Sequence, residues 1–418
     1  MKNPHSQIFI DDGLRRAQAA ARYRKRRGAL FKKVGCPIII AGVDNAPGDP
    51  HPWAHLHSFI YQDPLFLYLT GINQPHCVVA MVGARDILFV QPKNPKTEFW
   101  EGARFGVGDA IPGFSDIRPL EELPKFLATL NLVATFWHQS KVNKIIKDHN
   151  YALSKQLKSP KNISDIQYDL RQTLDAVDLD TMRLAQQKSA AAFKETLKNM
   201  TSFHSESEVA AFLDGQIAKQ SYFRNSFPSI VAGGKNAAIL HYTKNNDPLD
   251  QNELLLMDFG VRWHSMHADI SRTIPLSGKF NPVQRRLYEI VLGAQDIVEN
   301  NAKVGVTINQ LNDMCWSFVN AELHKNFKKI KLPYEKQPHN VGHLLGRQVH
   351  EGDAFREYRD TPLKAGWVIT NEPGIYGEFD GQAMGIRIED NLLIKKHGCE
   401  NLSSEIPKSI RDIEKALK

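Results

Sequence analysis

Two strand-like segments, ELLLMDFGVRW and SMHADISRTI, follow each other across a turn near residues 261–265 and carry Asp258 and Asp269. These aspartates are eleven residues apart, so on one straight strand they would face opposite sides of a sheet. Folded back as a hairpin, they can lie side by side and face the same way. Two close carboxylates raise each other's pKa unless a cation lies between them. The hairpin therefore predicts a metal site or, as the plainer alternative, salt bridges at the strand ends.

Two histidines, His264 and His267, fall at or beside this predicted turn. We expect both side chains on the outside, next to Trp263 and Met266. A mononuclear site that used both histidines would require the turn to fold under the sheet. The aspartates are therefore the stronger metal-ligand candidates.

Length and composition predict a globular protein of about two domains. The chain has 418 residues, too many for one ordinary core, and no low-complexity tract. Its longest apolar runs are far shorter than a membrane span, so we expect no membrane partner. Four scattered cysteines without CxxC spacing predict free thiols and a reducing, cytoplasmic location. The net charge of +7 is spread along the chain and indicates no nucleic-acid partner.

The N-terminal region holds a basic stretch, RRAQAAARYRKRRGALFKK, which has helical spacing over residues 14–33. We interpret it as a solvated, cationic first helix. A transit peptide or a nucleic-acid arm are alternatives. The acidic residues Asp11 and Asp12 just before it argue against a transit peptide.

Alternating helical and strand patterns predict an α/β (α+β) chain of two domains, residues 1–170 and 171–418. In the first domain, buried strands are predicted at 37–42, 66–71, 77–83, 85–92 and 132–138, with helices at 121–130 and 140–149. In the second domain, helices are predicted at 174–200, 205–220, 281–302 and 308–327. Asp178 and Asp180 are candidate caps of the first of these helices, and Ser205 of the second. The last part, 365–377 and 385–396, is predicted as strand.

Further metal-ligand types follow the hairpin: HNVGHLLGRQVH, TNEPGIY and GIRIED contain histidines, glutamates and an arginine. Each motif alone is weak. Together with LLLMDFG and ADISRTIP they resemble the pita-bread metallopeptidases, the family of methionine aminopeptidase, prolidase and aminopeptidase P. The resemblance covers residues 175 to the end. It implies five metal ligands, in the order Asp258, Asp269, His343, Glu372 and Glu389.

The same resemblance implies a site for two divalent ions, with Mn²⁺ expected and Co²⁺ or Zn²⁺ as alternatives. Asp269 and Glu389 would bridge the two ions, and a hydroxide between them would attack the peptide carbonyl. Glu372 would also move the proton. The remaining residues implied around the substrate are His241, His339, His350 and Arg387, with Tyr376 lining the pocket.

The first half of the chain also resembles the N-terminal, ribonuclease-H-like domain of aminopeptidase P and prolidase, through YQDPLFLYLTGINQPHCVVAMV and FWEGARFG. The resemblance implies an aminopeptidase for peptides with proline at the second position. Proline has no amide proton and a fixed backbone angle, so such bonds need a dedicated pocket. A prolidase restricted to dipeptides is one alternative, and a non-catalytic peptide- or protein-binding pita-bread protein is another.

The resemblance further implies a homodimer or homotetramer, in which Trp100 could reach a neighbour's active site. Three residues depart from the family pattern. Asn371 stands where relatives commonly carry an apolar residue, and Arg347 and Glu351 flank His350. None removes a ligand, but all three bear on substrate choice.

Overall fold

The computed structural model describes residues 16–43, 62–101, 103–130, 133–134, 163–221, 225–352 and 358–418. The chain divides into two compact units, residues 1–171 and 172–418, and each encloses a hydrophobic core. The predicted helix at 140–149 and most of the predicted strand at 132–138 lie outside the described residues. No helix in the described ranges is both long and apolar enough to cross a bilayer.

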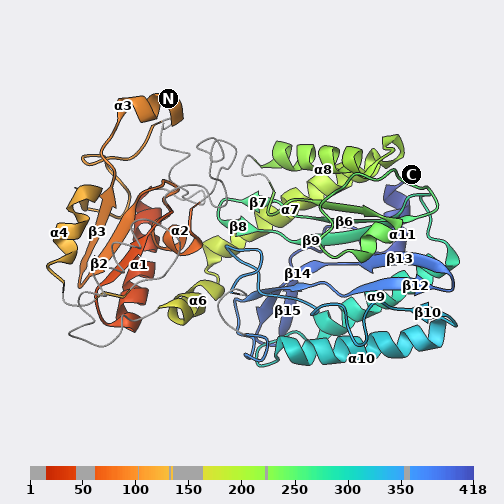
Figure 1. Ribbon diagram of the computed structural model, residues 1–418. Helices are drawn as coiled ribbons and strands as arrows, with labels where there is room; N and C mark the ends of the chain where they lie inside the picture. The colour runs from red at the N-terminus through yellow and green to blue at the C-terminus, as the bar shows by residue number, and fades with distance from the viewer. Residues whose placement is uncertain are drawn as a thin grey trace. The chain divides into compact units, whose positions relative to one another are not determined.

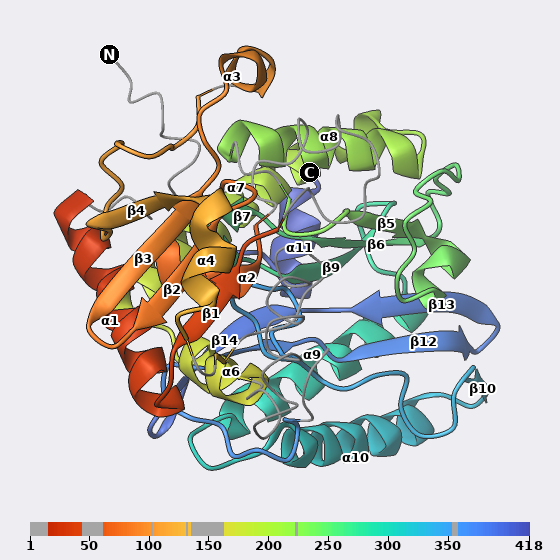
Figure 2. The ribbon, with the colours of Figure 1, turned by 60° about the vertical axis from the view of Figure 1, so that its left-hand side comes forward.

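The described residues of the first unit form a four-stranded sheet in the order β1-β2-β3-β4 (Figures 1 and 2). Its antiparallel strands are β1 (Ile38–Ala41), β2 (Val78–Val82) and β3 (Arg85–Val90), and β4 (Asp116–Pro119) runs parallel to β3. The first three strands confirm the predicted buried runs. Both faces are covered, with α1 (Arg16–Val34) and α2 (Pro64–Thr70) on one and α4 (Leu123–Leu127) on the other. This double burial explains why β1 and β2 are continuously apolar.

The strand predicted at 66–71 is wrong, because these residues form α2. Asp63 caps the helix by accepting a hydrogen bond from the Phe66 amide, and Pro64 occupies the first turn. Gly71 ends the helix in the left-handed conformation, with φ of 70°. All but the first residue of α2 are buried, so its apolar run carries no helical periodicity that would distinguish it from a buried strand.

The basic first helix is not uniformly solvated. Arg27 is fully buried and donates to Asp86 Oδ2 and to the carbonyl oxygens of Leu69 and Gly113, each at 2.8 Å. The guanidinium of Arg26 lies 4.4 Å from the ring centre of Tyr68. Part of the N-terminal positive charge therefore holds the first unit together.

In the second unit, helices cover both sides of a group of small antiparallel sheets (Figures 1 and 2). α7 (Ala176–Lys198) and α8 (Glu206–Gln220) lie on one side of the strands, and α9 (Pro282–Asn301) and α10 (Ile308–Asn326) lie on the other. These four helices agree with the predicted ones. The remaining helices among the described residues are α3 (Pro95–Glu101), α6 (Ser164–Gln172) and α11 (Ile410–Ala416), with 3₁₀ turns at Leu120–Glu122, Met200–Ser202 and Gly234–Ala238.

Three three-stranded sheets and one short hairpin fill the space between these helices. One sheet contains β5 (Ile230–Gly233), β6 (Leu254–Phe259) and β9 (Ile270–Pro275), and the hairpin is β7 (Arg262–Trp263) with β8 (Met266–His267). The second contains β10 (Ile330–Lys331), β12 (Gly374–Phe379) and β13 (Gln382–Arg387). The third contains β11 (Val368–Asn371), β14 (Asp390–Lys395) and β15 (Gly398–Asn401).

Ser205 caps α8, as predicted, but the cap of α7 is neither Asp178 nor Asp180. Asp175 caps α7, and its side chain accepts a hydrogen bond from the Asp178 amide. Asp178 instead pairs with Arg347 in the protein interior.

Replacing Asp175 by alanine should lower the free energy of unfolding by about 1 kcal/mol, because the first turn of α7 loses its cap. Denaturant titration of the purified protein measures the change. Asp180→Ala is the matched control, since its side chain is 76% exposed, and it should change stability by less than about 0.5 kcal/mol. Equal losses for the two variants would contradict the assignment.

Candidate metal centre

The pairing of β6 with β9 places Asp258 and Asp269 on one face. Asp258 lies opposite Ser271, and Asp269, two residues before Ser271, faces the same side. The hairpin is not continuous: the ladder breaks at Gly260, where an added Cβ would lie 1.8 Å from the Ala268 carbonyl oxygen. The predicted juxtaposition of the two aspartates is therefore confirmed, with a break in place of a regular hairpin.

A second pair of carboxylates arises in the same way. The segments predicted as single strands, 365–377 and 385–396, are each split, at Glu372 and at Glu389. Asn371 pairs with Asp390 on one side of the split and Gly374 with Arg387 on the other, so the register places Glu372 opposite Glu389. Facing acidic residues destabilise a ladder unless a cation compensates.

His343 joins these carboxylates from the loop before β11. Its amide donates to Thr370 Oγ1, and its carbonyl accepts from the Thr370 amide, both at 2.9 Å. Its Nε2 lies 3.4 Å from Asp269 Oδ2 and 3.5 Å from Glu372 Oε1. Its Nδ1 lies 3.1 Å from the Leu344 carbonyl oxygen and donates to it, which leaves Nε2 as the atom for a metal.

Of the ten residues predicted for the site, nine line one pocket of about 250 Å³ in the second unit, and Tyr376 is not among its lining residues. The acidic and metal-ligating ones lie deep, whereas His241 and His350 are exposed at its edge. Leu240, Asn340, Gly342 and Arg359 complete the lining. The nine are Asp258, Asp269, His343, Glu372, Glu389, Arg387, His241, His339 and His350.

Burial makes negative charge unfavourable here. It raises the pKa of Asp258 and of Glu389, and the neighbouring Asp269 and Glu372 charges raise both further. Burial also disfavours the protonated His343 ring, but the hydrogen bond with Asp269 and the charges of Glu372 and Asp269 outweigh it and raise the His343 pKa to about 9. Without a metal, protons therefore take the place of cations.

The residues fit a divalent metal on three observations. One ligand atom from each of Asp269, His343 and Glu389 lies within 4.8 Å of the others, and all three residues are buried. Asp258 Oδ1 is buried and has no hydrogen-bond partner among the described residues, although Oδ2 accepts from Arg387. A set of carboxylate oxygens with one imidazole suits Mn²⁺, Co²⁺ or Zn²⁺.

Comparison with known proteins agrees with this chemistry. The model of metallopeptidase family M24 matches residues 180–396, just over half of the chain, and that of the aminopeptidase P N-terminal domain matches residues 23–135. The chain belongs to metallopeptidase family M24. Its two units carry the aminopeptidase P N-domain and the pita-bread catalytic fold, as expected. Relatives named Xaa-Pro aminopeptidase, together with the M24 match, support a metallo-aminopeptidase.

Relatives within family M24 span most of the chain. It is 32% identical to the Xaa-Pro aminopeptidase of Haemophilus influenzae, over 85% of this chain and 88% of that protein. It is also 32% identical to the mitochondrial intermediate cleaving peptidase 55 of Arabidopsis thaliana, over 85% and 75%. Among solved structures, proline aminopeptidase P II of Yersinia pestis shares 25% identity, with a TM-score of 0.82 over 95% of this chain and 99% of that one.

Arg387 connects the two halves of this M24 site. Its Nη2 donates to Asp258 Oδ2 and its Nε to Ser271 Oγ, each at 2.7 Å, and its Nη1 donates to Tyr376 Oη at 3.1 Å. Because the Tyr376 hydroxyl accepts from Arg387, it can donate to His339 Nε2, also 3.1 Å away. His339 is then neutral, with Nδ1 donating to the Asn340 carbonyl, and burial lowers its pKa. Tyr376 lies behind the pocket wall and is 1% exposed.

The other two predicted histidines are at the pocket edge. The ring of His350 stacks on that of His343, with 4.0 Å between ring centres. His241 lies in the segment after β5, and a buried glutamate, Glu206, holds that segment. Glu206 accepts hydrogen bonds from the Gly233 amide, Asn236 Nδ2, Tyr242 Oη and the Asp247 amide.

The expectation that both turn histidines lie outside is wrong for His267, which is 5% exposed. Its amide donates to the Gly346 carbonyl, and β8 packs against α7. Burial lowers the His267 pKa well below its usual value, so the ring is neutral. His264 is partly buried at the turn, with φ of 50°. Neither histidine lines the pocket.

The departures Arg347 and Glu351 have structural roles: Arg347 pairs with Asp178, and Glu351 accepts from the Gln348 amide. The sequence did not indicate that Ser271 and Glu206 support the site. Ser271 Oγ donates to Glu389 Oε2 at 2.8 Å, and its place two residues after Asp269 could have indicated a shared face. The sequence pattern around Glu206 indicates only a helix N-terminus, and its hydrogen-bond partners are 27 to 41 residues away in the sequence.

Replacing Glu206 by glutamine should lower kcat/KM of peptide hydrolysis roughly ten- to hundredfold, because the segment that carries His241 loses acceptors and shifts. Steady-state kinetics measure the effect. The double variant with His241→Ala should be no slower than His241→Ala alone. Glu208→Gln, an exposed glutamate of the same turn, serves as control and should be unchanged. Additive losses in the double variant would show that Glu206 does not act through His241.

Proposed function

We propose that this chain is a dinuclear-metal aminopeptidase that hydrolyses the bond between an N-terminal residue and a following proline. The observation that carries the proposal is the convergence of four carboxylates and the His343 imidazole in the depth of a single pocket, in a chain of family M24. The Xaa-Pro aminopeptidase names of two relatives support the choice of bond.

Asp258, Asp269, His343, Glu372 and Glu389 would hold the two ions, with Asp269 and Glu389 shared between them. Manganese is the metal we propose, with cobalt and zinc as alternatives. Two bound ions would supply Lewis acidity and lower the pKa of a water molecule to near neutral.

The chain's own residues would orient the substrate and move protons. The Glu372 side chain is 17% exposed, more than the neighbouring ligands, so it is placed to take a proton from water and deliver it to the leaving nitrogen. His241 and His350 at the pocket edge would stabilise the tetrahedral oxyanion, and His339, which lies deeper, would help to enclose the proline ring. Arg387 would orient the peptide while it balances the charge of Asp258.

Two rival functions share this pocket. A prolidase would cut only the dipeptide Xaa-Pro, and a peptide-binding protein would cut neither. The likeness to an intermediate cleaving peptidase adds a third question, whether a residue other than proline is accepted at the second position. A peptide series that varies length and second residue separates these functions.

Purified protein should cleave an Xaa-Pro-Xaa tripeptide with added Mn²⁺ and not with chelator. Glu372→Gln should lower kcat by roughly 10²- to 10⁴-fold, because proton transfer is lost. Product analysis by mass spectrometry checks the bond. Cleavage of Xaa-Pro alone would identify a prolidase. Equal cleavage of Xaa-Ala-Xaa would refute proline selectivity, and turnover of neither peptide would favour the binding protein.

Metal binding should release protons at pH 7 and weaken as the pH falls. The metal needs deprotonated ligands, whereas in the metal-free chain burial raises the Asp258 and Glu389 pKa values and the adjacent carboxylates raise that of His343 to about 9. Calorimetry in two buffers of different ionisation enthalpy counts the released protons. Binding without proton release at pH 7 would contradict the charge state inferred for the site.

A homodimer or homotetramer and a cytoplasmic location remain proposals. Trp100 is 61% exposed on α3, and its ring contacts Phe99 edge to face. We propose that this tryptophan contacts a neighbouring copy in the oligomer.

A further inference from the structure

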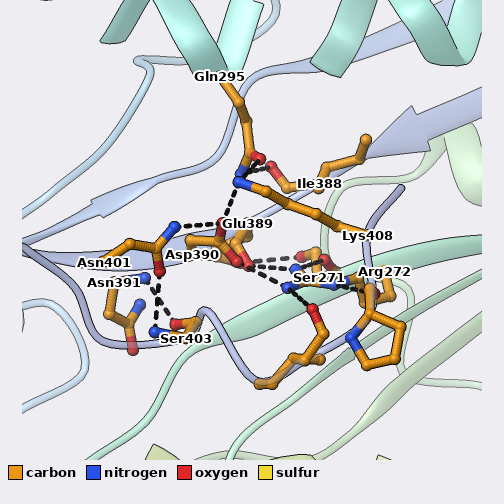
Figure 3. A network of polar contacts seen from close by, with 12 residues as sticks. Ser271, Arg272, Gln295, Ile388, Glu389, Asp390, Asn391, Asn401, Ser403 and Lys408 are labelled. Atoms are coloured by element: carbon orange, nitrogen blue, oxygen red, sulfur yellow. Dashed lines mark hydrogen bonds and ion pairs between the residues drawn. The ribbon is translucent and has the colours of Figure 1, made fainter. Parts of the chain in front are cut away.

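Gln295, in the middle of α9, makes three side-chain hydrogen bonds in the protein interior. Its Nε2 donates to the carbonyl oxygens of Asn371 and Ile388, both at 2.9 Å, and its Oε1 accepts from Lys408 Nζ at 3.0 Å. Figure 3 shows the contacts with Ile388 and Lys408. The residue is fully buried. A single amide group therefore joins three segments that are far apart in the sequence.

The two carbonyl groups that Gln295 joins have special positions. Asn371 directly precedes Glu372, and Ile388 directly precedes Glu389. At these two glutamates the strands do not hydrogen-bond to each other through their amides. The Glu372 amide donates to the Val341 carbonyl and the Glu389 amide to the Ser271 carbonyl. Gln295 thus bridges the strands where their ladder opens and the two glutamates enter the pocket.

The orientation of the Gln295 amide is fixed from behind. The Lys408 ammonium can only donate, so Oε1 must face it and Nε2 must face the carbonyls. Lys408 is itself held by Asp390 Oδ2, and Asp390 Oδ1 accepts from Arg272 at 2.7 Å (Figure 3). The Arg272 and Lys408 charges outweigh burial and lower the Asp390 pKa, so this carboxylate stays ionised.

The pairing with Asn371 is reciprocal. Its side-chain Nδ2 donates to the main-chain carbonyl of Gln295 at 3.1 Å. This contact gives the amide nitrogen of the fully buried Asn371 a partner. Three contacts from α9 therefore hold the backbone on either side of the break.

We propose that Gln295 is a positioning residue that sets the spacing between Glu372 and Glu389, and through it the affinity and separation of two bound metal ions. This inference rests on the proposed function of the pocket as a metal site. A leucine at position 295 would fill much of the same volume but leave two buried carbonyl groups without their donor. The strands would then be free to separate at the break, and the two carboxylates with them.

The test compares Gln295→Leu with Gln284→Leu. Gln284 is a second buried glutamine of α9 and belongs to the capping box at the start of this helix. It is far from Glu372 and Glu389 in the sequence. Both variants should unfold at lower denaturant concentration. Titration calorimetry with MnCl₂ should show affinity about 10- to 100-fold weaker for Gln295→Leu only. The electron paramagnetic resonance spectrum of the protein with two equivalents of Mn²⁺ should also change, since the coupling between the ions depends on their separation.

Gln295→Glu is a second variant that keeps the shape and the Lys408 partner but places carboxylate oxygens against two carbonyl oxygens. It should weaken Mn²⁺ binding at least as much as Gln295→Leu. Unchanged Mn²⁺ affinity and spectrum in either folded Gln295 variant would overturn the inference, as would an equal loss in Gln284→Leu. Absence of Mn²⁺ binding by the unaltered protein would instead overturn the proposed metal site itself.

Discussion

Mutual repulsion among buried carboxylates is the constraint on which this structure depends. Asp258, Asp269, Glu372 and Glu389 line one pocket of the second unit, where burial removes the water that would screen them. Such a group is stable only with protons or cations among the charges. The pKa of His343 is raised for the same reason, because its protonated ring places a positive charge among these carboxylates. Everything around the pocket holds the four acids together against this repulsion.

The protein holds the four acids together mainly through the geometry of its backbone. Near each pair of acids an antiparallel ladder opens, at Gly260 beside Asp269 for one pair and between Asn371 and Gly374 for the other, while Asp258 lies in the last paired part of β6 opposite Ser271. Opening the ladder turns the acidic side chains into the pocket and leaves backbone groups to be satisfied elsewhere. Side chains of helices and neighbouring strands, such as Gln295 and Ser271, take up those hydrogen bonds or hold the acids directly.

Much of this arrangement could be predicted from the sequence. The long helices of the second unit have clear periodicity, and the order and flanks of the acids identified the family. Predictions failed where local patterns are ambiguous. The buried α2 reads like a strand because its apolar run is continuous, although Asp63 and Gly71 are helix-end signals. His267 is a polar residue at a turn, and only its packing against other parts of the chain buries it.

The supporting residues were beyond prediction for a different reason. Gln295 is a polar residue in the middle of α9, which periodicity treats as a tolerated exception, and Glu206 is one of several polar residues at the start of α8, where such residues are ordinary. Their partners are distant in the sequence, so no local pattern points to them. The departure at Asn371 likewise had no explanation until its partner on α9 was known.

The contacts of the C-terminal segment have a consequence for biosynthesis. Arg272 donates to the carbonyl oxygens of Ile406 and Pro407, and Lys408 reaches both Asp390 and Gln295. A growing chain that has not yet emerged past these residues keeps Arg272 and Asp390 without some of their partners. The first unit can fold early during translation, because domains fold as units from the N-terminal side. The pocket, by contrast, cannot be completed until the segment around Lys408 has been synthesised, so a competent site forms later than the first unit.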